Sequence, residues 1–184
     1  MSLYVGTEDL QAGLPEILAA PASVGTVELV VRRPAEGERE VLEEGVLDVD
    51  EGLVGDDWAR RGSSRTGDGS PHPGMQVTLM NVRVTALVAG ERDRWPLAGD
   101  QLYVDLDLRP GNLPPGTRLR IGSATVEVTE EPHTGCAKFT ERFGPAAIRF
   151  VNGKSGRALR LRGMYVRVVE GGTVRPGDAI TKLP

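Results

Sequence analysis

The sequence has very few of the residues that build metal clusters and covalent cross-links. Its 184 residues include one cysteine, Cys136, and two histidines. One cysteine excludes a disulfide within the chain and cannot hold an iron–sulfur cluster. A structural zinc site normally takes four ligands, so His133 and Cys136, in an H-x-x-C arrangement, form only half of one. Any thiol chemistry in this chain must therefore run through Cys136.

Aromatic residues and long apolar runs are also scarce. An aromatic content of 4% and a net charge of −4 argue against a nucleic-acid partner, which needs stacking platforms and positive charge. No run of 18 apolar residues is present, and residues 1–20 lack the basic start and apolar core of a signal peptide. We therefore expect no membrane span and a cytoplasmic location.

Charge is unevenly distributed along the chain. Residues 36–57 include ten acidic residues and one basic residue, whereas residues 138–167 include eight basic residues and one acidic residue. Such an asymmetry is commonly a solvated surface. The alternative is a local site for an anionic ligand, because an acidic protein seldom concentrates arginines without a reason.

Glycine and proline are abundant, with 24 and 13 residues, and this is typical of a chain with many turns and short strands. Alternating and β-branched stretches predict strands at 24–33, 76–80, 101–108, 117–121, 124–129, 164–169 and 179–183. Helices are expected at 10–20, at 82–89 with Asn81 as cap, and at 139–151. The pattern predicts a mainly β protein, a closed or nearly closed barrel with a few short peripheral helices. The loop at 60–74 has no periodicity, and we expect it to be adaptable and to border the pocket of Cys136.

Cys136 lies between a predicted strand and a predicted helix, in the segment EPHTGCAKF at 131–139. The positive end of a helix dipole and the nearby Lys138 both favour a thiolate, which is the form that attacks electrophiles and binds soft metals. The alternative is a buried cysteine that acts as a small apolar filler. These residues alone leave both interpretations open.

Several motifs resemble the MOSC domain family, named for the C-terminal part of molybdenum cofactor sulfurases. In chain order they are GLVGD at 52–56, GTRLRIGSA at 116–124, GCAKF at 135–139, GMYVRV at 163–168 and GTVRPGD at 172–178. The resemblance covers residues 24–183 approximately. The family often carries Gly-Glu-Asn-Leu where this chain has GDQL at 99–102, and the His-Gly-rich loop of some relatives is matched only loosely at 72–74. These departures bear on the identity of the substrate more than on the fold.

The resemblance implies a MOSC β-barrel over residues 24–184, after an N-terminal extension at 1–23 that we expect to be helical. It also implies that Cys136 either ligates the molybdenum of the molybdopterin cofactor or carries sulfur as a persulfide. Because the cofactor bears a phosphate, which arginine binds bidentately, basic residues near Cys136 are candidates for its site. The candidate cofactor-binding residues are Arg160, Arg162, Asp100, Gln101 and His72. Arg160 and Arg162 alternate on an expected strand and would then share a face.

Three functions follow from these alternatives. The first is an enzyme, a stand-alone bacterial-type oxidoreductase that reduces N-hydroxylated small molecules such as amidoximes, with electrons from a separate donor. The second is a sulfur carrier or transferase that receives a persulfide on Cys136 from a cysteine desulfurase and delivers it for metal–sulfur cluster assembly. We expect no pyridoxal-phosphate domain in a chain of this length. The third is a small non-enzymatic binding barrel in which Cys136 only packs.

Overall fold

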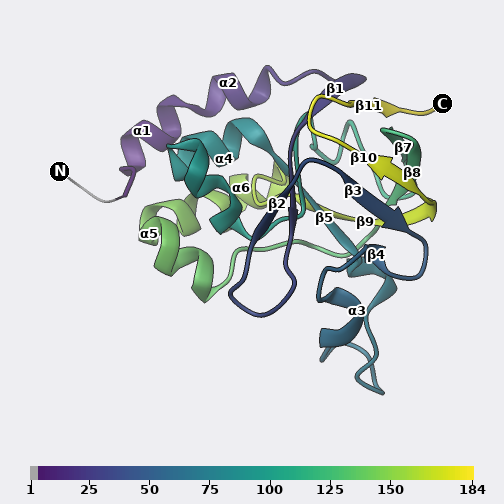
Figure 1. The fold of residues 1–184 in the computed structure, drawn as a ribbon. Coiled ribbons are helices and arrows are strands. Elements are labelled where there is room, and N and C mark those ends of the chain that lie inside the picture. The colour runs from purple at the N-terminus through teal and green to yellow at the C-terminus, as the bar shows by residue number, and fades with distance from the viewer. Residues whose placement is uncertain (1–3) are drawn as a thin grey trace.

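A closed seven-stranded β-barrel forms the centre of the computed structural model, which describes residues 4–184 (Figure 1). The barrel strands are β1 (Val24–Arg32), β5 (Val77–Asn81), β6 (Leu102–Asp105), β7 (Arg118–Ile121), β8 (Ala124–Val128), β9 (Met164–Glu170) and β11 (Ala179–Lys182). Their order around the barrel is β11, β7, β8, β9, β5, β6 and β1, and pairing of β1 with β11 closes it. Only β5 and β6 run parallel. The expected mainly β barrel is thus confirmed.

One wall of the barrel, built by β1, β5 and β6, is buried on both faces. Val27, Leu79 and Val104 face the barrel interior, where they join the larger apolar core. Met80 and Tyr103 point the other way, into a second core between the barrel and the helices. A strand covered on both faces has no polar face, which explains why these segments read as nearly continuous apolar runs.

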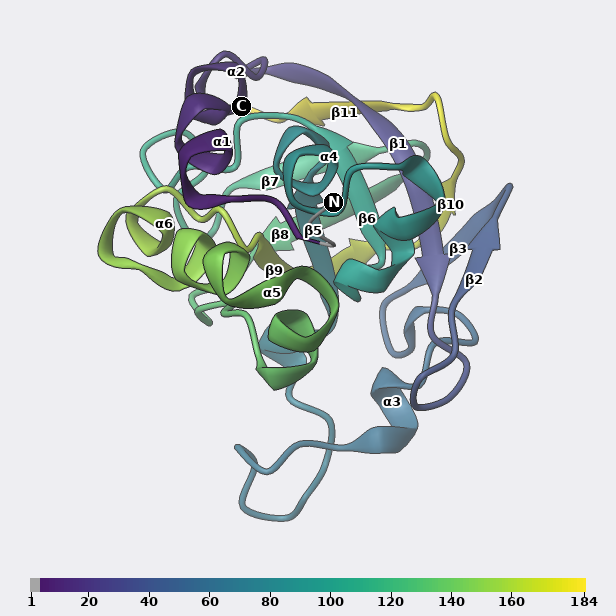
Figure 2. The same ribbon diagram turned by 90° about the vertical axis from the view of Figure 1, so that its left-hand side faces the viewer.

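The helices gather on that wall and cover it (Figure 2). They are α1 (Thr7–Ala12), α2 (Leu14–Leu18), α4 (Val82–Ala89), α5 (Ala137–Asn152) and α6 (Lys154–Ala158), with the 3-10 helix η2 (Arg92–Ala98) beside α4. The predicted α4 is confirmed, and the Asn81 side chain accepts a hydrogen bond from the backbone N–H of Arg83 as its cap. The α5 helix is interrupted at Gly144, whose φ of 86° lies in the left-handed region.

The N-terminal segment contains two short helices in place of the expected single helix at 10–20. Gly13 separates α1 from α2, and Pro15 lies in the first turn of α2. Leu10 and Ile17 are buried against the helical layer. The division into an extension at 1–23 and a barrel domain at 24–184 remains a prediction, and residues 1–3 of that extension lie outside the described part.

Several short elements border the barrel at its other side. A small sheet has the order β10 (Gly172–Val174), β3 (Gly45–Asp48) and β4 (Gly52–Leu53), and β2 (Glu40–Leu42) pairs with the end of β1. The four-residue helix α3 (Trp58–Arg61) and the 3-10 helix η1 (Pro73–Met75) include the two ends of the expected loop at 60–74. None of these strands was predicted, because two to four residues carry too little periodicity to be recognised.

Among the helices at positions 4–184, none combines the length and the apolar character that a bilayer crossing requires.

Candidate functional site

Cys136 occupies the N-cap position of α5, and its side chain is exposed. The loop before it is fastened to the far end of the same helix, since Asn152 accepts a hydrogen bond from Gly135 N–H at 2.8 Å and donates one to Gly135 O at 2.9 Å. A side chain at Gly135 would collide with Ile148. The close approach that glycine permits therefore places the thiol at the helix start and holds it at the surface.

The thiol borders a pocket of about 410 Å³ between the helical layer and the acidic segment. This volume is within the range of small-molecule and cofactor sites. The charged residues that line it are six cations and two acids, namely Arg33, Arg39, Arg61, Lys138, Arg142 and Arg162 with Glu36 and Asp57. The pocket therefore favours an anionic occupant.

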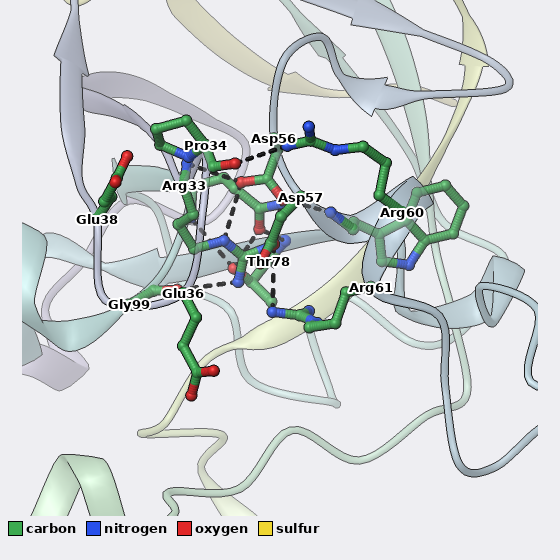
Figure 3. A network of polar contacts seen from close by, with 12 residues as sticks. Arg33, Pro34, Glu36, Glu38, Asp56, Asp57, Arg60, Arg61, Thr78 and Gly99 are labelled. Carbon is green, nitrogen blue, oxygen red and sulfur yellow. Dashed lines mark hydrogen bonds and ion pairs between the residues drawn. The ribbon is translucent and has the colours of Figure 1, made fainter.

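Four of these six cations have a carboxylate partner. The pairs are Arg33–Asp56 at 2.7 Å, Arg162–Asp100 at 2.6 Å, Arg61–Asp57 at 3.3 Å and Lys138–Glu36 at 2.5 Å. Arg33 and Asp56 are linked through three side-chain and backbone hydrogen bonds of 2.7–2.9 Å, and Figure 3 shows this network next to Arg61 and Asp57. Burial alone would lower the pKa of Arg33, but the hydrogen bonds and charge of Asp56 outweigh it and raise that pKa.

The other two cations, Arg39 and Arg142, have no carboxylate partner within the described residues. Arg39 donates to the carbonyl oxygens of Pro96 and Glu38, and Arg142 donates to that of Leu97. Gly99 lies close to both guanidinium groups, because a Cβ there would be 3.5 Å from Arg39 and 3.9 Å from Arg142. Burial, followed by the positive charges of Arg142 and Arg33, lowers the pKa of Arg39. An anion between the two guanidinium groups would relieve this excess of positive charge.

A cluster of three buried polar residues forms the deep wall of the pocket. Arg162 donates to Asp100 Oδ2 at 2.6 Å and to Ala98 O at 2.8 Å, and its guanidinium lies over the ring of Phe139. His133 Nδ1 is 3.7 Å from Asp100 Oδ1. These two atoms and Arg162 Nε are buried without a hydrogen-bond partner in the described chain. Unpaired buried polar atoms are rare in native proteins and are typical of functional sites.

The sequence-predicted candidates divide into two groups. Arg162 lines the Cys136 pocket and Asp100 supports it from behind, so the structure brings both to the expected place. Arg160 lines a neighbouring cavity of about 270 Å³, which Arg162 also borders, and donates to the carbonyl oxygens of Leu108 and Leu113. The expectation that Arg160 and Arg162 share a strand face is wrong, because both lie in the turn between α6 and β9.

Gln101 and His72 do not line the Cys136 pocket. Gln101 is fully buried at the start of β6, where its Oε1 accepts hydrogen bonds from the N–H and hydroxyl of Thr78. His72 Nδ1 accepts from Gly74 N–H, and the ring borders a cavity of about 80 Å³ that also touches His133. These hydrogen bonds of Gln101 and His72 stabilise the backbone around the pocket.

Of the expected loop at 60–74, only Arg61 borders the pocket, and it is the last residue of α3. Arg65 forms an ion pair of 3.1 Å with Glu131 on the segment before Cys136, and the adaptability of the loop remains a prediction.

Sequence reasoning did not identify Arg33, Arg39, Arg142 and Tyr165 as pocket residues. Arg39 is the single basic residue in the acidic segment 36–57, and this isolated positive charge could have marked it as a candidate for the site. His133 was noted only as half of a zinc site. Its three-residue spacing from Cys136 could have marked it as a neighbour in the pocket.

The residues fit a molybdenum-bearing cofactor better than a protein-only metal site. No group of three or more His, Cys, Asp or Glu residues in the described part could hold a metal ion by itself. The pocket instead offers one exposed thiol and two unpaired arginines, which suit a soft metal attached to an anionic organic ligand.

Comparisons with solved structures show the same fold in several bacterial proteins. The YuaD protein from Bacillus subtilis superposes with a TM-score of 0.62 at 19% identity, covering 85% of this chain and 94% of that one. YiiM from Escherichia coli gives 0.55 at 19% identity, covering 86% and 70%. YiiM from Geobacillus stearothermophilus gives 0.53 at 14% identity, covering 90% and 75%.

No curated protein matches the sequence significantly. The family model of the MOSC domain, however, matches residues 76–181, which include β5 to β9, the loop with Cys136 and most of β11. This match spans more than half of the chain and agrees with the motifs and the closed barrel. The chain belongs to the MOSC domain family.

Proposed function

We propose that this MOSC protein binds the molybdenum cofactor in the pocket beside Cys136 and acts as an oxidoreductase on N-hydroxylated small molecules. The observation that carries this proposal is the exposed thiol of Cys136 on the border of a cationic pocket. A packing role for Cys136 would need a buried side chain. The exposed thiol therefore supports a chemical role for Cys136 over a packing role.

Cys136 would hold the metal. Cys136 is the one sulfur ligand among the residues that line this pocket, and molybdenum in a sulfur-rich environment prefers a thiolate to an alcohol. The clamp between Gly135 and Asn152 fixes the backbone on which the thiol stands, so the ligand would be preorganised. When bound, the cofactor supplies a redox metal that can pass two electrons to a substrate.

Arg39 and Arg142 would hold the phosphate of the cofactor. They lack carboxylate partners within residues 4–184, whereas the other pocket cations are already neutralised. Two planar guanidinium groups close to Gly99 offer several donors to one oxyanion. This assignment differs from the pair Arg160 and Arg162, because Arg160 faces another cavity and Arg162 is engaged by Asp100.

The overall reaction breaks the N–O bond of the substrate. An amidoxime takes up two electrons and two protons, and gives an amidine and water. The electrons would come from a separate donor protein, since one cysteine cannot hold an iron–sulfur centre.

An exposed thiol also suits the sulfur-carrier function, in which Cys136 would bear a persulfide without any metal.

The test is reduction of benzamidoxime by the purified protein with a chemically reduced electron donor. Cys136→Ser should lose activity, and Arg142→Gln should lose most cofactor. Arg149→Gln is the matched control, because Arg149 is exposed on the same helix and lines none of the pockets described above. A wild-type protein without turnover that gains one sulfur atom in mass from a cysteine desulfurase would favour the sulfur carrier.

A further inference from the structure

His133 occupies a central place among the cavities of the protein. Its ring borders the Cys136 pocket, the 270 Å³ cavity near Arg160 and the 80 Å³ cavity near His72. The side chain is 10% exposed, and its ring packs on Tyr165 with centroids 4.6 Å apart. The contact with Tyr165 and the surrounding walls hold the ring in one orientation.

The two nitrogens of this ring have different surroundings. Nδ1 is shut off from solvent and faces the carboxylate of Asp100 at 3.7 Å. Nε2 is not among the buried unpaired atoms, and the one acid in ion-pair distance of the described ring is Asp100, on the Nδ1 side. The ring therefore presents Nε2, and not Nδ1, to the accessible space.

Asp100 decides which nitrogen carries the proton. Arg162 binds its Oδ2 and keeps the carboxylate oriented, which leaves Oδ1 as an acceptor without a donor. Burial raises the pKa of Asp100, and the charge and hydrogen bond of Arg162 oppose this shift. The Oδ1 of the ionised carboxylate can only accept, so a hydrogen on Nδ1 is the one that suits the 3.7 Å approach of the two atoms. Burial, followed by the charges of Arg162 and Arg33, also lowers the pKa of His133 well below its usual value, so the ring carries one proton at neutral pH.

We propose that Asp100 fixes His133 as the Nδ1–H tautomer, and that the Nε2 lone pair selects substrates that offer an N–O–H donor. This inference rests on the proposed function, since it names the substrate feature that the same pocket recognises. His133 is thus a specificity-determining residue, and Asp100 is a positioning residue. The two acids that line the pocket, Glu36 and Asp57, are paired with Lys138 and Arg61, so Nε2 supplies an acceptor without a cationic partner for a neutral N-hydroxylated molecule.

The tautomer can be measured directly, because the chain has only two histidines. In protein labelled with 15N-histidine, His72→Gln assigns the remaining ring to His133. At pH 7.5 we expect a protonated Nδ1 and an unprotonated Nε2, and Asp100→Asn should reverse or mix the two forms. An Nε2–H ring in the wild type would overturn the proposal, whether or not Asp100→Asn folds.

Substrate selection is tested with benzamidoxime and its O-methyl ether, which lacks the N–O–H donor. Benzamidoxime should shift the Nε2 resonance and bind about tenfold more tightly than the ether, as expected for one hydrogen bond. His133→Phe should abolish this preference, and His133→Gln, which keeps an acceptor, should retain part of it. Equal binding of both compounds to the wild type would overturn the proposal. Lack of turnover with normal binding would overturn only the proposed reductase function.

Discussion

The Cys136 pocket has two walls of opposite character. The deep wall contains Asp100, Arg162 and His133, with side chains that are 0%, 7% and 10% exposed. The rim contains Lys138 and Glu36, with side chains that are 53% and 83% exposed. Both walls carry ion pairs of nearly the same length, 2.6 Å and 2.5 Å. Their energetic consequences should nevertheless differ greatly.

Solvent explains the difference. A charge in the deep wall loses its partner without gaining water, so breaking the pair is costly. A charge on the rim exchanges its partner for water, and salt screens what remains. The deep wall can therefore hold the His133 ring and the Asp100 carboxylate in one protonation state. The ion pair on the rim can break when a ligand binds. The following predictions test this contrast.

Arg162→Met should have the largest effect. The substitution leaves the Asp100 carboxylate buried without its partner, and we expect a loss of about 3–5 kcal/mol in the free energy of unfolding. Urea denaturation measures it. A loss below about 1 kcal/mol would mean that Asp100 is not held as an ion in the deep wall.

Gly163→Ala should cost about 2–4 kcal/mol, because φ is +100° and the new Cβ would lie against the carbonyl oxygen of Leu79. This glycine follows Arg162 and sets its position. Gly177→Ala is the matched control, with φ of +93° but open space around the Cβ. Equal losses in the two variants would show that close packing at Gly163 is unimportant.

Acidification from pH 7.5 to 5.5 should destabilise the protein by about 1 kcal/mol through His133. The pKa of His133 is lowered in the folded protein. Below the ordinary pKa near 6.5, His133 is protonated in the unfolded chain and stays neutral in the folded chain. The free energy of unfolding therefore falls as the pH falls. Asp56, whose pKa Arg33 lowers against the opposing effect of burial, contributes only at more acidic pH.

The comparison for that measurement is His133→Gln, which should lose this part of the pH dependence. Thermal unfolding at the two pH values is sufficient. An unchanged pH dependence in His133→Gln would contradict a buried neutral ring.

Lys138→Met should have the smallest effect on stability. The ion pair with Glu36 is on the rim and exposed, and we expect the unfolding midpoint to change by about 1 °C or less. A shift comparable to that of Arg162→Met would remove the distinction between the walls.

Much of the barrel could be predicted from the sequence, because alternation in β7 and β8 and apolar runs in β5 and β6 are strong signals. The short strands β2, β3, β4 and β10 could not, since their conformation depends on partners far along the chain. The helix α6 was also missed, because Gly156 lowers the helix propensity of its five residues.

The site was accessible to sequence reasoning only in part. Cys136 lies in one of the family motifs, whereas Arg162 and Asp100 were candidates because of their charge and their place near such motifs. Arg33 and Arg39 precede Cys136 by about a hundred residues and lie in or beside an acidic segment. Only the closed barrel brings that segment to the start of α5, so no local pattern could show that these arginines face the thiol.

The most direct test of the central claim is the molybdenum content of the purified protein. Wild-type protein and Cys136→Ser would be expressed in a molybdate-fed host and compared for molybdenum and pterin per chain. We predict molybdenum and pterin in the wild type, loss of most of the metal in Cys136→Ser, and unchanged unfolding of that variant. Equal molybdenum in both proteins, or none in the wild type, would contradict the assignment of Cys136 as the metal ligand.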